Sequence, residues 1–169
     1  MKAIRTILFL ALLGIFLQPV FTQAQATEKQ ATVKVSGEVT TPLELKLSDI
    51  QQMAQTTVVR KDRDGNDHSY SGVVLATILQ KAGATMGKDL KGENLTKYVS
   101  VEASDGYQVI FALAELDKDF TDRTIILADM IDGKPLAAGD GPFRIIVQDE
   151  KKPARCIKMV TAIKVGFAK

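Results

Sequence analysis

The sequence contains very few residues of the types that build redox and metal sites. Among its 169 residues there is one cysteine, Cys156, one histidine, His68, and no tryptophan. A single cysteine cannot form a disulfide within the chain, and it excludes a Cys-x-x-Cys-His haem attachment. A lone histidine cannot build a zinc site, which typically takes three or four protein ligands. Any electron transfer by this chain would therefore require another protein.

Long apolar runs are also scarce, and the longest lies near the N-terminus. Residues Ile7 to Leu17 are uninterrupted and apolar, Lys2 and Arg5 precede them, and Ala24-Gln25-Ala26 offers the small residues of a cleavage site. This run is too short to cross a bilayer core, which needs about twenty residues. The pattern predicts a signal peptide over residues 1–26, cleaved after Ala26. An uncleaved membrane anchor is the alternative, which the early end of the run disfavours.

Charge of neither sign dominates. The chain has 22 Lys and Arg against 20 Asp and Glu, and removal of Lys2 and Arg5 with the leader leaves 20 against 20. Nucleic-acid-binding domains carry a basic patch or stripe, so no nucleic-acid partner is expected. The sequence predicts a neutral protein that is periplasmic or secreted, with no membrane span after cleavage. A free thiol is a hazard in an oxidising compartment unless it is buried, so we expect Cys156 to be buried.

Short alternating runs separated by turn residues predict one strand-rich domain over residues 33–167, after a disordered segment over 27–32. One helix is expected to start at Ser48, capped by its side chain and by Gln51, and another spans 74–82 and ends at Gly83. Residues 84–95 are typical of a surface connection. Strands are predicted over 33–39, 43–47, 56–61, 98–103, 107–112, 124–128, 143–148 and 157–165. The expected fold class is α+β.

Five segments of the chain, taken in order, resemble the molybdopterin-binding domain of the sulfite oxidase family. The matching segments are Val35–Val39 with Pro42–Leu45, Tyr70–Val73 leading into Ile78-Leu79, Leu127-Ala128 with Asp132–Leu136, Gly141–Val147, and Cys156–Met159. The last of these is similar to the family's Ser-Val-Lys-Trp. The resemblance implies a mixed β-sheet, barrel-like sandwich with a few short helices, and molybdopterin as the family's cofactor.

The same resemblance exposes a missing metal ligand. In catalytic members of the family, a cysteine in the loop after the third strand binds molybdenum through its thiolate, and a soft sulfur suits such a metal. The corresponding stretch here, residues 57–63, has no Cys, Ser or Met. We therefore expect no metal ligand from this chain. Cys156 is interpreted as a buried structural thiol; ligation or redox sensing, with a thiol pKa lowered by Arg155 and Lys158, is the alternative.

Four cations are candidate cofactor-binding residues. The resemblance places Lys158 near the phosphate of the pterin, and Arg155 could grip a phosphate with its guanidinium fork. Arg60 and Arg63 belong to the densest positive cluster, where the cofactor loop should lie, and such a cluster attracts anions. Each has a simpler interpretation: an exposed strand position for Lys158, a pairing with a carboxylate for Arg155, and a solvated hairpin tip for the other two.

The sequence favours an exported, non-catalytic module that binds a pterin-type or other small anionic ligand or a partner protein. One alternative is a molybdopterin-dependent oxidoreductase, or a subunit of one, that uses an unusual metal ligand. A second alternative is a purely structural or interaction module whose ancestral pocket has filled with side chains. The geometry around Arg60, Arg155 and Lys158 bears on this choice, because an open polar cleft favours ligand binding and a closed apolar one does not.

Overall fold

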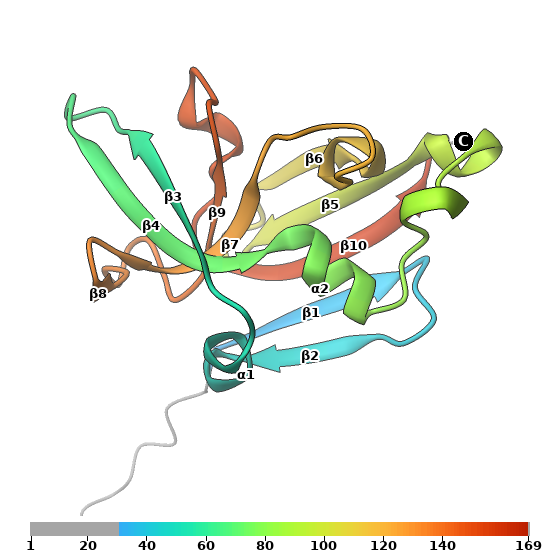
Figure 1. The fold of residues 1–169 in the computed structure, drawn as a ribbon. Helices are drawn as coiled ribbons and strands as arrows, with labels where there is room; N and C mark the ends of the chain where they lie inside the picture. Colours follow the sequence, from blue (N-terminus) through green and yellow to red (C-terminus); the bar gives the residue numbers. More distant parts are fainter. Residues whose placement is uncertain (1–30, 169) are drawn as a thin grey trace, which may run out of the picture.

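The computed structural model describes residues 31–168, so the predicted signal peptide and residues 27–30 lie outside the described residues. Two five-stranded sheets face each other across a common core (Figure 1). The strands are β1 (Thr32–Gly37), β2 (Leu43–Lys46), β3 (Thr56–Lys61), β4 (Asp67–Val74), β5 (Lys97–Ala103), β6 (Gln108–Ala112), β7 (Ile125–Ile131), β8 (Lys134–Pro135), β9 (Arg144–Val147) and β10 (Val160–Phe167). The helices are α1 (Leu47–Gln52), α2 (Leu75–Lys81) and the short 3₁₀ helices η1 (Gly87–Asp89), η2 (Gly92–Thr96), η3 (Leu113–Leu116) and η4 (Pro153–Arg155).

The first sheet has the strand order β2-β1-β10-β5-β6. Strands β1 and β10 run parallel and the other neighbours are antiparallel, so the sheet is mixed. Val35 lies opposite Ile163, which lies opposite Val101 on the next strand. All three side chains are buried, because alternate residues of a strand point to the same face and this face is covered by the second sheet.

The second sheet has the order β3-β4-β7-β8, and β9 also pairs with β7. Every residue of β9 is buried, and so are the first five of β7. These strands are mostly apolar because both of their faces are covered, and the charged residues Arg144 and Asp129 are buried within them. One face contributes to the large core between the sheets, and the other belongs to a smaller cluster of Val58, Tyr70, Ile126, Ala128 and Ile146. The predicted α+β sandwich with few, short helices is confirmed.

Helix α1 begins one residue earlier than expected, and its capping residues differ from the predicted pair. Lys46 is the N-cap, and the carboxylate of Asp49 accepts a hydrogen bond from the Lys46 N–H at 2.8 Å. Ser48 therefore lies within the first turn, because the charged acceptor of Asp49 is favoured at the positive end of the helix. Helix α2 agrees with the prediction, and Gly83 follows it with a φ of +74°. No helix among residues 31–168 combines the length and apolar character that crossing a bilayer requires.

Two connections differ from the sequence prediction. Residues 84–95, expected to be a surface connection, include two 3₁₀ turns and the buried Leu90. The last strand begins at Val160 and not at Ile157, because Met159 adopts a left-handed φ of +52° that ends any extended run. Residues 156–159 are thus a loop between η4 and β10, and this loop forms part of the site described next.

Candidate functional site

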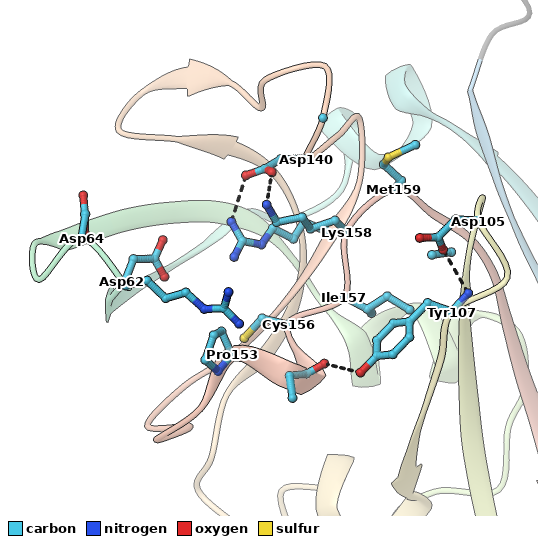
Figure 2. Close-up of a pocket in the computed structure, with 15 residues that line it drawn as sticks. Asp62, Asp64, Asp105, Tyr107, Asp140, Pro153, Cys156, Ile157, Lys158 and Met159 are labelled. Atoms are coloured by element: carbon cyan, nitrogen blue, oxygen red, sulfur yellow. Dashed lines mark hydrogen bonds and ion pairs between the residues drawn. The ribbon is translucent and has the colours of Figure 1, made fainter.

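A cleft of about 570 Å³ opens at one end of the sandwich, where four loops meet (Figure 2). The loops are the β3–β4 turn, the β5–β6 turn, the segment before β9 and the segment between η4 and β10. Residues that line the cleft include Asp62, Arg63, Asp64, Asp105, Tyr107, Asp140, Arg144, Cys156, Ile157, Lys158 and Met159. The lining mixes apolar side chains with charged side chains of both signs, so the cleft has not filled with apolar side chains.

Cys156 lies at the floor of the cleft, and the expectation that it is buried is confirmed. The residue is 3% exposed, and its Sγ accepts hydrogen bonds from the Val147 N–H at 3.5 Å and from Arg60 Nη1 at 3.6 Å. Burial raises the pKa of the thiol, although the Val147 N–H and the arginines Arg60 and Arg144 oppose that effect. Cys156 is therefore a neutral thiol at ordinary pH, in agreement with its interpretation as a buried structural thiol.

Arg60 is buried beneath the cleft rather than exposed at a hairpin tip. It lies on β3, with Nη1 at 3.4 Å from Asp62 Oδ1 and Nη2 at 3.4 Å from the carbonyl oxygen of Glu150. Its Nε has no hydrogen-bond partner among the described residues. The guanidinium thus links the β3–β4 hairpin to the segment after β9, and whether it also contacts a ligand stays a prediction.

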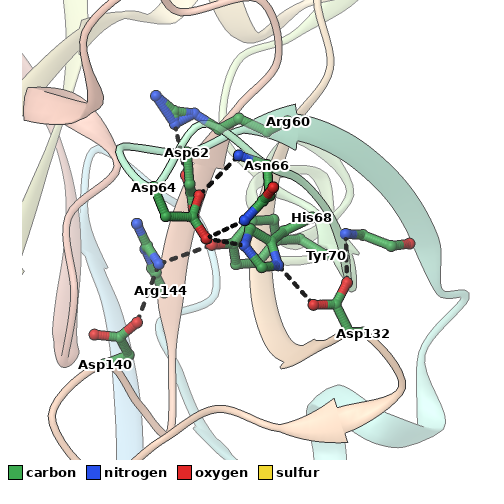
Figure 3. Close-up of polar contacts among 10 residues, drawn as sticks. Arg60, Asp62, Asp64, Asn66, His68, Tyr70, Asp132, Asp140 and Arg144 are labelled. Atoms are coloured by element: carbon green, nitrogen blue, oxygen red, sulfur yellow. Dashed lines mark hydrogen bonds and ion pairs between the residues drawn. The ribbon is translucent and has the colours of Figure 1, made fainter.

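Arg144 is the second buried arginine of the site, and a polar network surrounds it (Figure 3). Its Nη1 donates to the Tyr70 hydroxyl at 3.0 Å and to Asp140 Oδ2 at 3.1 Å, and its guanidinium carbon lies 5.2 Å from the centre of the Tyr70 ring. The Tyr70 hydroxyl donates in turn to Asp62 at 2.5 Å. Burial, followed by this bond to Asp62, raises the pKa of Tyr70, so its proton is firmly held.

Arg155 points away from the cleft. Its two terminal nitrogens bind Glu115 Oε1 at 2.9 Å and Glu150 Oε2 at 2.8 Å, and the guanidinium lies over the ring of Phe111. The pairing with Glu150 agrees with the simpler interpretation of Arg155, in which its guanidinium pairs with a carboxylate. A role for Arg155 in cofactor binding stays a prediction, but the structure gives this side chain a role in joining η4 to β6 and η3.

Lys158 and Arg63 are the two predicted residues that line the cleft. The side chain of Lys158 is 51% exposed and its Nζ forms an ion pair with Asp140 Oδ1. Arg63 is exposed at the β3–β4 turn and forms no ion pair with any residue between 31 and 168. These two are the exposed cations of the cleft, whereas Arg144 lines it as a buried side chain and Arg60 is buried outside its lining.

Two features of the site were not anticipated from the sequence. Asp140 bridges Arg144 and Lys158, and Tyr70 bridges Arg144 and Asp62. The sequence feature that could have indicated Asp140 is its position between Gly139 and Gly141, because it is a charged residue within a glycine-rich turn. Tyr70 gives no such signal, because an aromatic residue in a strand is usually explained by packing alone.

His68 is held by two carboxylates at the rim of the site (Figure 3). Its Nδ1 lies 2.6 Å from Asp132 Oδ2 and its Nε2 lies 2.9 Å from Asp64 Oδ2. These contacts, first that with Asp64 and then that with Asp132, raise the pKa of His68 to about 9. The hydrogen bond with His68 also lowers the pKa of Asp64 to about 2. The pKa of Asp132 lies below its usual value, mainly because its carboxylate accepts from the Ser69 N–H and secondly because of His68. The cluster joins the β3–β4 turn to the β7–β8 turn.

The His68 cluster predicts a defined dependence of stability on pH. The folded pKa near 9 lies above the ordinary value of about 6.5, so the contribution of the cluster is complete below pH 6.5 and disappears as the pH rises through 9. The depressed carboxylate pKa values add loss only below about pH 4. We expect His68→Gln to reduce the free energy of unfolding at pH 5.5 and to leave it nearly unchanged at pH 10, measured by urea denaturation. An equal loss in the free energy of unfolding at both pH values would contradict the assignment. Because His68 is the one histidine of the sequence, NMR titration of its ring protons gives the pKa directly.

The residues of the site do not fit a molybdenum centre. Among residues 31–168 no group of three or more His, Cys, Asp or Glu side chains is arranged to hold a metal ion. The only sulfur of a cysteine belongs to a buried neutral thiol, and the positive guanidinium of Arg60 already donates to it. A metal at that sulfur would need a thiolate, whereas burial, the largest influence on the pKa of Cys156, favours the neutral thiol. No redox step through a metal is therefore derived for this chain.

Comparison with known proteins agrees with the resemblance seen in the sequence. The model of the family described as "Oxidoreductase molybdopterin binding domain" matches residues 20–168. Comparison with curated protein sequences finds no significant match. Among solved structures, the sulfane dehydrogenase SoxCD from Paracoccus pantotrophus matches with a TM-score of 0.63 and 18% identity, over 80% of this chain and 38% of that chain. The chain thus spans well under half of the length of that relative, and identity at this level shows a shared fold. Because the family match covers nearly the whole sequence, the chain belongs to the oxidoreductase molybdopterin-binding domain family.

Proposed function

We propose that this chain is an exported, non-catalytic binding module whose cleft takes a pterin-type or other small anionic ligand. The observation that supports it is a polar cleft that carries accessible cations and lacks a thiolate. Arg63 and Lys158 line the cleft, while Cys156 is a buried neutral thiol. Membership of the family fixes the fold but not the reaction, because function depends on the particular residues of the site.

The apolar part of the lining supports a ligand with a ring. The side chain of Tyr107 lies at the rim, 51% exposed, and its hydroxyl donates to the carbonyl oxygen of Ala154 at 3.1 Å. Met159, 36% exposed, lies in the opening as well, and Ile157 lies deeper (Figure 2). An exposed aromatic face and an exposed thioether in the same cleft offer a planar ligand both stacking and sulfur contacts. Arg63 and Lys158 would then bind its anionic group.

The proposal is tested on protein purified natively from cells that express the full chain with its leader. Native mass spectrometry would reveal a bound small molecule, and the same spectrum would show whether the mature chain begins at Thr27. Elemental analysis decides between the proposal and its main alternative. We expect less than stoichiometric molybdenum; a ratio near one atom per chain would establish the molybdopterin-dependent oxidoreductase instead, with a ligand from outside this chain.

Lys158→Ala is expected to weaken the binding of inorganic phosphate about tenfold, measured by isothermal titration. Loss of a hydrogen bond to a charged group costs about 1.5–3 kcal/mol, and the lower end applies to a half-exposed side chain. Lys164→Ala is the matched control, because it removes the same charge from an exposed position on β10 outside the cleft. Equal affinities of the two variants would remove Lys158 from the site. A wild-type protein that binds neither phosphate nor a pterin, and gains no phosphate affinity when Asp140 is neutralised, would favour the structural module.

A further inference from the structure

Two cations of the cleft share one carboxylate, and that carboxylate comes from the chain itself. Asp140 Oδ2 accepts a hydrogen bond from Arg144 Nη1 at 3.1 Å, and Asp140 Oδ1 pairs with Lys158 Nζ (Figures 2 and 3). A carboxylate held between an arginine fork and a lysine occupies the position that the oxyanion of a ligand would take. We propose that Asp140 is an internal competitor, which lowers the affinity of the cleft for anions and is displaced when a ligand binds. The inference rests on the proposed function and specifies how that site is regulated.

The arginine of this arrangement is fixed in position. Arg144 is the first residue of β9, which pairs with β7 in the second sheet, and it is 6% exposed. The Tyr70 hydroxyl accepts from its Nη1 at 3.0 Å, so one contact persists without Asp140. Its Nε has no hydrogen-bond partner among residues 31–168. A cation withdrawn from water in this way requires an anion beside it, which either Asp140 or a ligand can supply.

The carboxylate, in contrast, can leave without a movement of the backbone. The Asp140 main chain is anchored, because its carbonyl oxygen accepts from the Met159 N–H at 3.1 Å and its N–H donates to the carbonyl oxygen of Ala137 at 2.8 Å. Its side chain is 25% exposed at the cleft, so rotation about the side-chain bonds would turn the carboxylate towards water. A short side chain with a solvated alternative position is easily displaced by a competing anion. Loop opening is not required.

The chemistry of the two cations indicates the class of ligand. Lys158 supplies a compact ammonium charge and Arg144 one terminal nitrogen of its guanidinium, and both are directed at one carboxylate group. One group fits between them, so the arrangement suits a single phosphate or carboxylate better than a longer polyphosphate chain. A phosphate dianion would have an advantage over the Asp140 carboxylate, because it carries more charge and more acceptor oxygens.

Asp140→Asn is the decisive variant, and Asp105→Asn is its matched control. Asparagine has the shape of aspartate but leaves Arg144 and Lys158 without a counterion. Asp105 also lines the cleft, but within the described part of the chain its one side-chain contact is the hydrogen bond that Oδ1 accepts from the Tyr107 N–H at 3.0 Å, a turn contact that asparagine preserves. Binding of inorganic phosphate is measured by isothermal titration for wild type and both variants. We expect Asp140→Asn to bind about tenfold more tightly than wild type, and Asp105→Asn to remain within about twofold.

Each outcome separates this inference from the proposed function. If wild type binds phosphate and Asp140→Asn binds no more tightly than Asp105→Asn, the competitor role is overturned while the binding module stands. If phosphate binds to Asp140→Asn and not to wild type, the inference is supported in its strongest form. If no variant binds, both proposals fall. Should Asp140→Asn not fold, Asp140→Ser serves in its place, and the double variant Asp140→Asn/Lys158→Ala should lose most of the gain.

Discussion

Replacing Gly72 with alanine is expected to destabilise the domain by about 3 kcal/mol, near the upper end of overpacking effects. A Cβ at this position would lie 2.1 Å from the carbonyl oxygen of Leu127 and 2.5 Å from Cα of Ala128. Both are backbone atoms of β7, and they cannot move aside without breaking the β4–β7 ladder, whose register already shifts between Ser71 and Gly72. Urea denaturation of the folded protein gives the difference in free energy of unfolding.

Gly139→Ala is the matched control for this prediction. An added Cβ at Gly139 would meet no heavy atom within 4 Å, so we expect a change of less than about 0.5 kcal/mol. A stability of Gly72→Ala equal to that of Gly139→Ala would contradict the close approach of the two strands. The contact matters for the site because Gly72 is two residues from Tyr70, whose hydroxyl lies between Asp62 and Arg144. Strands β4 and β7 must therefore stay close for the network beneath the cleft to form.

Local patterns in the sequence predicted most of the strands. Residues 56–61 form a strand with the predicted bounds, because the run is β-branched and Asp64-Gly65 supplies the turn after it. The end of α2 before Gly83 also follows from neighbouring residues. Predictions were wrong where a backbone torsion departs from its usual range, as at Met159, whose positive φ no sequence pattern indicated.

The candidate site could be predicted only in part, because its contacts join residues far apart in the chain. Lys158 and Arg63 line the cleft as cationic residues, yet nothing in the sequence indicated that Arg60 would reach the sulfur of Cys156. These two residues are 96 positions apart. The bridge formed by Asp140 depends on the positions of β9 and of the loop before β10, which are set by the packing of the whole sandwich.

The buried arginines hold together the segments that meet beneath the cleft. Arg60 contacts Asp62, Cys156 and Glu150, so it ties together segments that meet beneath the cleft. Arg144 does the same for Tyr70 and Asp140. Buried charges of this kind cost free energy unless they are paired, and within residues 31–168 the Nε of each guanidinium has no hydrogen-bond partner. The polar network maintains the shape of the cleft, and its stability depends on the apolar core around it.

Phe143→Ala is expected to have the largest effect on stability, a loss of about 3–5 kcal/mol in the free energy of unfolding. Phe143 is fully buried in the core between the sheets, and its removal would leave a large cavity there. In the chain, Phe143 also lies between Asp140, which is the proposed competitor, and Arg144, which is the cation that Asp140 and a ligand would share. Its carbonyl oxygen accepts from the Val160 N–H at 3.0 Å, which joins β9 to the start of β10. Thermal and urea denaturation both report the loss.

Phe120→Ala separates this effect from a general effect of removing an aromatic ring. Phe120 is 49% exposed, and we expect its truncation to cost less than about 1 kcal/mol. At a temperature where both variants are folded, Phe143→Ala should also bind phosphate more weakly than Phe120→Ala, because a cavity beside β9 loosens the position of Arg144. Unchanged phosphate affinity in a destabilised but folded Phe143→Ala would mean that the Tyr70 hydroxyl and Asp140 alone position Arg144. Equal stability losses for the two variants would contradict the packing of Phe143 in the core.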